Sequence, residues 1–558
     1  TSTYAKKLLA SLTPATAAQN SPWPTLAEQL SKVKVVPGSA FEQLIKDNQE
    51  FGMLRLDEAS DKRRLPPWIR VWWRKAHPEL VYSAADPTGG YPLVLKEIVE
   101  WMEHHQDLKA APADPSSPPP DSPEATVTGE QRISGAQTTA RSESDIRINY
   151  FDPTKILSAS NAIVSGGHQA VFYSTDSGAT WGQTSLPFTA SDTSHSDPTV
   201  DWTSDGRGWS STLGIQGGTL RLRNYFTTDN GANWTFETTP SGSQTSVDKQ
   251  MVWVDHNSAS PFFNQQYAIW HNGTPAFVSR RTAGAGGTWS APLQVSGAES
   301  TGTAIGSDIK TNSAGDVFAF WPTTGNRRVL IAKSINGGTS YGTPVQIATT
   351  FDSFDIGVPS FNGRRALIYT ASAAYKTATK NLAYTTWTDL SGDAGCTAAA
   401  NEPGTNVAST CKTRVWFSRS TDGGATWSTP AKISNQAGLN DQFNQWLVVD
   451  ETTGALAIMY YDTVADAGRK KVHVYYQGSF DDGVNWSAPL QVTTAQTDET
   501  TAGADSGNQF GDYNGLSGYA GIFFPSWTDR RNNAREEIWT VKINDQACTA
   551  PGVPTGPG

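Results

Sequence analysis

Seven aspartates recur along the chain, each at the start of a segment that favours a β-strand. They are Asp145, Asp197, Asp248, Asp308, Asp355, Asp441 and Asp512, and the intervals between them are 52, 51, 60, 47, 86 and 71 residues. If the fold brings these segments together, the carboxylates converge and repel one another unless cations, basic side chains or hydrogen-bond donors compensate them. Such a ring predicts a Ca²⁺ site or a site for a cationic ligand. The alternative is that each aspartate accepts hydrogen bonds from backbone N–H groups of its own loop.

Two of these segments carry the most oxygen-bearing side chains. Asp441 is followed by Gln442 and Asn444, and Asp512 is followed by Asn514. Because Ca²⁺ prefers oxygen ligands, we take Asp441, Asn444 and Asp512 as candidate metal ligands. No other motif requires a cofactor, since P-loop, dinucleotide-binding and metalloprotease fingerprints are missing from the sequence.

An eight-residue turn motif indicates a repeated fold. It reads Ser-Thr-Asp-Ser-Gly-Ala-Thr-Trp at residues 174–181, recurs at 227–234, 420–427 and 479–486, and is degraded at 282–289 and 334–341. Asp can accept hydrogen bonds from the turn, Gly supplies a positive φ and Trp covers the hairpin, so the motif is structural. A repeat of about 50 residues is typical of propeller blades.

This SxDxGxTW motif resembles the Asp-box, or bacterial neuraminidase repeat, of sialidase-like β-propellers. The resemblance covers roughly the C-terminal three-quarters of the chain and says nothing about residues 1–110. The family includes sialidases, other carbohydrate-active enzymes and binding or adhesion proteins. Seven aspartate-led strands predict seven blades, one more than the six of the family's sialidases. We expect a strand near residues 126–133 to complete the last blade and close the ring.

The predicted fold class is mainly β: a seven-bladed β-propeller with Asp-box hairpins, preceded by a small α-helical domain. We place the helical domain at residues 1–110, a proline-rich linker at 111–125, the propeller at 126–545 and a Pro/Gly tail at 546–558. Residues 62–75 combine six cations with Trp68, Trp72 and Trp73. This segment could meet a membrane interface or an acidic partner, or dock within the protein.

Charge and cysteine content restrict the class of protein. The 43 basic and 53 acidic side chains give a net charge of −10, which argues against nucleic-acid binding by bulk charge. No apolar run is long enough to span a bilayer. Cys396 and Cys411, 15 residues apart in a Gly/Ala/Thr/Asn-rich insertion, predict a disulfide in an extracellular or periplasmic protein, with two free thiols as the alternative.

The resemblance also implies a catalytic set that can be sought in this chain. Sialidases bind the substrate carboxylate with three arginines and use a Tyr nucleophile and an Asp acid/base. Arg147, in Ile-Arg-Ile-Asn, occupies the position of the first arginine, although both flanking residues of the family motif are altered. No other predicted inner strand offers an arginine. The candidate catalytic residues are therefore Arg147, Asp197 and Tyr513, with Tyr513 lacking an evident Glu partner.

Other side chains have both a chemical and a structural interpretation. His195 could serve as a general base or ligand, or lie in a surface loop. Trp202, Trp253, Trp446 and Trp527 could stack on sugar rings or pack between blades.

We expect a secreted propeller that recognises glycans or another extracellular polymer on its carboxylate-lined face. One alternative is an exo-acting glycoside hydrolase of sialidase type. The other is a structural or assembly protein that binds a protein partner through residues 1–110.

Overall fold

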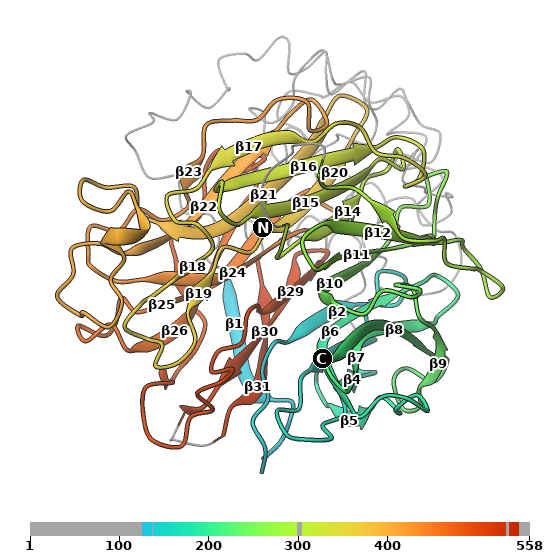
Figure 1. The fold of residues 1–558 in the computed structure, drawn as a ribbon, viewed down its shortest axis with the longest axis horizontal. Coiled ribbons are helices and arrows are strands. Elements are labelled where there is room, and N and C mark those ends of the chain that lie inside the picture. Colours follow the sequence, from blue (N-terminus) through green and yellow to red (C-terminus); the bar gives the residue numbers. More distant parts are fainter. Residues whose placement is uncertain (1–124, 137, 298–303, 532–534, 546–558) are drawn as a thin grey trace, which may run out of the picture. The chain divides into compact units, whose positions relative to one another are not determined.

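A computed structural model describes residues 125–136, 138–297, 304–531 and 535–545. Within these ranges the chain forms seven antiparallel blades and one small two-stranded sheet (Figure 1). The same ranges contain no α-helix and one 3₁₀ turn, Ala399–Asn401. The mainly β, seven-bladed propeller is thus confirmed. The predicted helical domain, the linker up to residue 124 and the tail lie outside the described residues.

Each of the first four blades has its strands in chain order from the inside outwards. Blade one comprises β2 (Asp145–Ile148), β3 (Ile156–Ser160), β4 (Ala170–Ser174) and β5 (Gly182–Ser185). Blade two comprises β6 (Ser194–Trp202), β7 (Gly208–Gln216), β8 (Thr219–Thr227) and β9 (Thr235–Thr238). Blade three comprises β10 (Val247–Val254), β11 (Gln266–Asn272), β12 (Ala276–Arg281) and β13 (Leu293–Gln294). Blade four comprises β14 (Asp308–Thr311), β15 (Val317–Thr323), β16 (Arg328–Ser334) and β17 (Val345–Thr349).

The remaining blades follow the same plan with two additions. Blade five comprises β20 (Ala371–Lys376), β21 (Asn381–Leu390), β22 (Thr413–Ser420) and β23 (Ala431–Lys432). Blade six comprises β24 (Gln442–Val449), β25 (Leu456–Asp462), β26 (Lys471–Ser479) and β27 (Leu490–Gln491), with β28 (Thr497–Asp498) paired to β26. Blade seven comprises β29 (Gly515–Tyr519), β30 (Ile522–Asp529), β31 (Glu537–Asn544) and β1 (Thr126–Arg132).

The ring closes through β1, which supplies the outermost strand of the last blade. Thr126 pairs with Asn544 and Val127 with Ile543 in an antiparallel register. In Figure 1 the cyan strand β1 lies with the red strands of blade seven. The predicted closing strand near residues 126–133 is confirmed. Closure joins the two ends of the propeller sequence in one hydrogen-bonded sheet, so the blades cannot separate without breaking that ladder.

One predicted inner strand is wrong. Asp355 begins β18 (Asp355–Ile356), which pairs with β19 (Ala366–Leu367) in a separate two-stranded sheet. The inner strand of blade five is β20, which begins at Ala371 and carries no acidic residue. Gly357 and Pro359 follow β18 directly and disfavour its continuation, because Gly weakens extended structure and Pro lacks a ladder N–H.

The repeated turn motif is built from short local hydrogen bonds. In the first copy Ser174 Oγ donates to Asp176 Oδ1 at 2.8 Å, and the N–H of Thr180 donates to the same oxygen at 2.9 Å. The glycine of the motif, Gly178, has a φ of 84°. A Cβ at Gly178 would lie 2.6 Å from the ring of Phe524 in blade seven. The glycine therefore serves both the turn and the close approach of the neighbouring blade.

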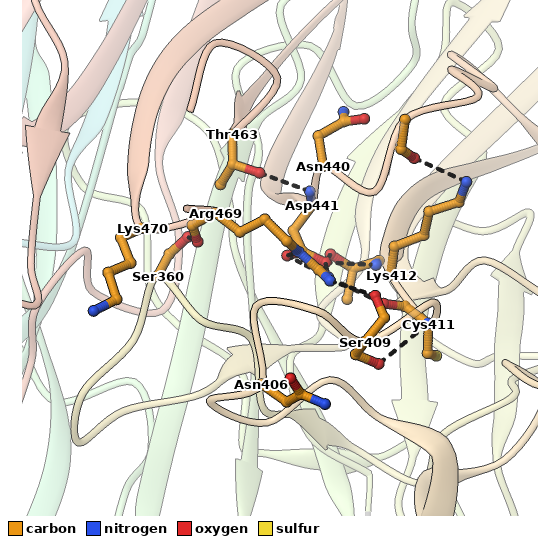
Figure 2. Close-up of polar contacts among 12 residues, drawn as sticks. Ser360, Asn406, Ser409, Cys411, Lys412, Asn440, Asp441, Thr463, Arg469 and Lys470 are labelled. Carbon is orange, nitrogen blue, oxygen red and sulfur yellow. Dashed lines mark hydrogen bonds and ion pairs between the residues drawn. The ribbon is translucent and has the colours of Figure 1, made fainter. Parts of the chain in front are cut away.

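A polar cluster ties the insertion in blade five to blade six. Cys396 and Cys411 form a disulfide, as predicted. Arg469 donates to both carboxylate oxygens of Asp441, at 2.9 and 2.8 Å, and to the carbonyls of Ser409 and Cys411 at 2.8 and 3.0 Å (Figure 2). Because Arg469 and Asp441 are both buried, this ion pair fixes the end of the disulfide loop against the inner strand of blade six.

Replacing both cysteines with serine in the double variant Cys396→Ser/Cys411→Ser should lower the free energy of unfolding. A disulfide that closes a loop of this size restricts the unfolded chain and contributes about 3 kcal/mol. Urea denaturation of the variant and the wild type, each with and without reductant, measures the difference. Equal midpoints for the oxidised wild type and the double variant would contradict the stabilising role.

Candidate functional site

The seven inner strands form a closed ring around the central channel. Neighbouring inner strands contact one another in the order β2, β6, β10, β14, β20, β24 and β29, and β29 returns to β2. Because all blades share one up-and-down strand order, every inner strand starts at the same end of the channel. We call this end the channel mouth. It comprises Glu143, Asp197, Asp248, Lys249, Arg364, Tyr369, Asp512 and Tyr513.

Four residues at or just before the starts of inner strands have an unusual backbone conformation. The φ angles of Glu143, Asp197, Lys249 and Asn444 are 57°, 54°, 46° and 48°. The last three lie at β-bulges, where the register of β6, β10 and β24 shifts against the next strand. Left-handed φ values are costly for residues other than glycine and cluster at functional sites, and bulges re-aim side chains. The backbone thus re-aims a polar side chain at the start of four of the seven inner strands, and in three of them that side chain is an acid or a base.

Lys249 lies at the centre of the mouth among aromatic rings. Its Nζ is 4.0 Å from the ring centroid of Tyr513, 5.3 Å from that of Tyr369 and 5.5 Å from that of Trp446. These distances permit cation–π attraction. The Lys249 side chain is buried, and burial lowers its pKa to about 8 despite the neighbouring carboxylates. A lysine in this setting can lose its proton near neutral pH.

Two buried carboxyl groups accompany Lys249. Asn161 connects them, because its Nδ2 donates to Glu143 Oε2 at 2.5 Å and its Oδ1 accepts the N–H of Asp197 at 2.7 Å. Burial raises the pKa of Asp197 well above its usual value, and the charge of Glu143 adds to the effect. Burial likewise raises the pKa of Glu143, although Arg364 opposes the shift. At least one of these carboxyls therefore holds a proton where an exposed one would not.

Asp248 behaves in the opposite way. Its side chain is 49% exposed, and His271 Nε2 lies 3.6 Å from its Oδ2. Partial burial alone would raise the pKa of Asp248, but the nearby imidazole of His271 and the backbone N–H of Lys249, which donates to Asp248 Oδ1 at 2.9 Å, outweigh it and leave the pKa lowered. The mouth thus combines a carboxyl that retains its proton, Asp197, with a carboxylate that stays ionised, Asp248.

Arg364 reaches the mouth from outside the blades. It lies between β18 and β19, and its Nη2 contacts Asp512 and lies 3.7 Å from Glu143 Oε1. Gln509 holds this segment in place, since its Oε1 accepts the N–H groups of residues 362, 363 and 364 at 3.2, 3.1 and 2.8 Å. The Arg364 side chain is 31% exposed, so a ligand can reach it.

The structure brings together two of the three predicted catalytic residues. Tyr513 donates its hydroxyl to the carbonyl of Pro198, next to Asp197, at 3.4 Å. Burial raises the pKa of Tyr513 well above its usual value, so its phenol stays protonated at neutral pH. Arg147 instead donates to Asp145 Oδ1 at 3.0 Å, and its guanidinium lies 5.7 Å from the ring of Trp253.

Three arginines with different acidic partners occupy separate places in the described part of the chain. Arg147 pairs with Asp145 and Arg364 with Asp512, while Arg531 binds Glu130 and Asp529 in blade seven. A shared carboxylate subsite needs guanidinium groups that converge. These three do not converge.

His195 is buried rather than exposed in a surface loop. It forms part of β6, and its ring lies 4.8 Å from that of Phe188. Burial lowers the pKa of His195 to about 4, so the imidazole is neutral near pH 7. The four tryptophans considered for sugar stacking, Trp202, Trp253, Trp446 and Trp527, are buried as well. Their rings pack within the propeller instead of lining an open rim.

The predicted calcium ligands are bound by protein groups. Asp441 accepts from Arg469 and from the N–H of Thr413 at 3.0 Å, Asn444 Nδ2 donates to the carbonyl of Gly511 at 2.9 Å, and Asp512 contacts Arg364. Guanidinium groups repel a cation, so this arrangement fits Ca²⁺ poorly. Across the described ranges, no group of three or more His, Cys, Asp or Glu side chains is arranged to hold a metal.

Sequence reasoning missed Glu143, Lys249 and Tyr369, and it could not place Arg364 at the centre. Lys249 directly follows Asp248, which the sequence did indicate, yet no sequence pattern indicates the bulge that turns Lys249 inward.

None of the described residues forms a helix long and apolar enough to cross a membrane.

Comparison with known proteins adds similarities of fold. No family profile matches the chain, and no curated protein sequence matches it. A protein of unknown function from Dyadobacter fermentans aligns over 76% of this chain and 99% of its own, at 11% identity and a TM-score of 0.38. The BP39L lectin from Burkholderia pseudomallei aligns over 72% and 96%, at 12% identity and 0.43. The Hadza microbial sialidase Hz136 aligns over 61% and 65%, at 11% identity and 0.39.

Asp197→Asn should stabilise the protein more as the pH rises. The pKa of Asp197 is raised in the folded state, so the stability that its protonated form contributes is complete below about pH 4 and is lost at higher pH. The neutral amide of Asn does not ionise, so the variant keeps this stability at high pH. We expect the free energy of unfolding of Asp197→Asn, relative to wild type, to be about 1–2 kcal/mol higher at pH 8 than at pH 4.

Denaturant unfolding at pH 4, 6 and 8 measures this gain. The exposed Asp205→Asn is the matched control and should show the same difference from wild type at each pH. A stability difference for Asp197→Asn that does not change with pH would show that Asp197 ionises normally.

Proposed function

We propose that the protein binds glycans at the channel mouth. The observation that carries the proposal is the layered arrangement of charge there. Asp248, Arg364 and Asp512 are partly exposed, with side chains 49%, 31% and 17% accessible, above the buried Lys249 and its aromatic neighbours. A ligand that approaches the mouth meets hydrogen-bonding groups of both charges at its rim.

Polyhydroxylated ligands suit such a rim. Sugar hydroxyls donate to ionised carboxylates such as Asp248 and accept from guanidinium groups such as Arg364, and neighbouring hydroxyls can bind both in the same ring. The buried layer beneath restricts the movement of these side chains and lowers the entropy lost on binding. The sequence resemblance to sialidase-like propellers supports the same class of ligand.

Glycoside hydrolysis at the same site is a second candidate, favoured by the opposite pKa shifts of two carboxyls. Asp197 retains its proton and could protonate a leaving oxygen, whereas ionised Asp248 could activate water or stabilise positive charge. Tyr513 is a candidate nucleophile only if a base removes its proton, and its hydroxyl contacts a backbone carbonyl instead of a carboxylate.

We also propose that the protein is located in the extracellular space or the periplasm. The Cys396–Cys411 disulfide supports an extracellular or periplasmic protein, because disulfides persist in oxidising compartments.

Glycan binding and hydrolysis can be tested on the same variants. A glycan array is probed with the wild type and with Arg364→Ala. We expect the binding signals of Arg364→Ala to be about tenfold or more below those of the wild type, because the exposed guanidinium is lost. Ile335→Ala, an exposed change in the turn motif at residues 334–341, should leave the signals at the wild-type level. If the wild type binds no glycan, or if Arg364→Ala binds as well as wild type, the mouth is not the binding site.

A panel of 4-nitrophenyl and methylumbelliferyl glycosides, sialosides included, separates the enzyme from the binding protein. Turnover that falls at least about 100-fold in Asp197→Asn supports the acid role. Turnover abolished by Tyr513→Phe would assign the nucleophile and overturn binding alone. Absence of turnover on every glycoside leaves recognition as the function.

Ca²⁺ binding stays a prediction, with a direct test. A ligand that binds only the folded state raises the melting temperature, so chelation should lower it if Ca²⁺ is bound. Melting curves with chelator and with added Ca²⁺ decide the point, and identical curves would remove the metal from the proposal.

A further inference from the structure

A groove lies between blades four and five, away from the channel mouth. Its volume is about 480 Å³. The outer strand β17 forms one wall with Gln346 and Thr349, and blade five forms the other with Trp387 and Trp416. Phe351, two residues after the end of β17, also lines the groove. Cavities of this size accommodate small ligands such as one or two sugar rings.

The blade-five wall is an aromatic platform. Trp387 in β21 pairs directly with Trp416 in β22, which places both side chains on the same face of the sheet. The ring of Phe351 lies 5.6 Å from that of Trp416. The indole N–H of Trp416 donates to the carbonyl of Leu390 at 3.0 Å, which restrains the ring. Trp416 is partly exposed, whereas its cross-strand neighbour Trp387 is buried.

The repeat does not require a tryptophan at this position. Trp416 lies four residues before the first residue of the turn motif, and the same position in the five other copies holds Ala170, Arg223, Val278, Leu330 and Tyr475. All five of those side chains are buried. Blade five is therefore the copy in which this position carries a large flat ring that packs against the core on one side and is still partly exposed.

The polar groups of the groove indicate a ligand without charge. Asp389 is buried, and its carboxylate already accepts the N–H groups of Phe351, Asp352 and Leu390 at 2.7, 3.0 and 2.8 Å. The Nζ of Lys432 lies over the Trp416 ring, 5.6 Å from its centroid, and pairs with Asp393 at 3.0 Å. The charges at the groove are thus compensated within the protein.

The rim of the groove supplies neutral hydrogen-bonding groups. Gln346, Thr349 and Thr429 are exposed at its edges. A flat aromatic face bordered by amide and hydroxyl groups matches a pyranose ring, whose C–H face packs on an aromatic ring while its hydroxyls bond around the edge.

We propose that the groove between blades four and five is a second binding site, which takes a neutral oligosaccharide with one sugar ring stacked on Trp416. This site is separate from the channel mouth and does not depend on the function proposed there. In a protein with two sites, one chain of a polymer can engage both, or the groove can hold a polymer while the mouth acts on another part of it.

Isothermal titration of the full-length protein at pH 7 with cellotetraose, laminaritetraose, mannotetraose and xylotetraose tests the groove. We expect the wild type to bind at least one of them and Trp416→Ala to raise its Kd about tenfold or more. Phe236→Ala removes an exposed aromatic ring from an outer strand of blade two, and it should leave that Kd unchanged.

A second variant protects the test against misfolding of Trp416→Ala. Thr349→Trp adds bulk from the exposed opposite wall and should block the groove without removing core packing. Binding that both groove variants weaken, and that Arg364→Ala at the mouth does not, supports the proposal. If none of the four sugars binds the wild type, or if Trp416→Ala and Thr349→Trp bind like wild type, the groove is not a saccharide site. If only Arg364→Ala weakens binding, the sugar binds at the mouth and the proposal is overturned.

Discussion

Buried aspartates that accept a backbone N–H from the next blade hold the centre of this propeller together. Asp145 Oδ2 accepts from Val200 at 2.9 Å, Asp201 Oδ2 from Val254 at 2.7 Å, and Asp308 Oδ2 from Ser372 at 2.7 Å. A nearby cation, in addition to the hydrogen-bond donors, further stabilises a buried carboxylate. Arg147, His256 and Lys310 supply it, at 3.0, 2.8 and 2.5 Å from their partners.

At the channel mouth, cations compensate the buried carboxyl groups less completely. Glu143 lies near Lys249 and the partly exposed Arg364, and Asp197 lies near Lys249, yet burial raises the pKa of both carboxyls. The buried carboxyls of the ring and those of the channel mouth are therefore surrounded by the same residue types. They differ in the number of cations near each carboxyl.

Periodic features could be predicted from the sequence, and features that depend on single side chains could not. The turn motif repeats because each copy needs the same local hydrogen bonds, so it revealed the blades and the closing strand. Asp355 misled the prediction because acidity alone does not mark an inner strand, and blade five has none there. Arg147 was assigned to the ligand site, yet it forms a buried ion pair with Asp145. Lys249 and Arg364 are placed by a bulge and by Gln509, which leave no periodic signal.

The closing strand also sets the order of events during synthesis. β1 leaves the ribosome before every other strand of the propeller, while its partner β31 is made after all the other blades. The first strand must therefore stay unpaired for more than 400 residues, from Thr126 to Asn544, before its ladder can form. Pairings of such long sequence separation are slow, and the exposed edge is prone to wrong association meanwhile. The completed ring is a product of the finished chain, and a truncated translation product lacks it entirely.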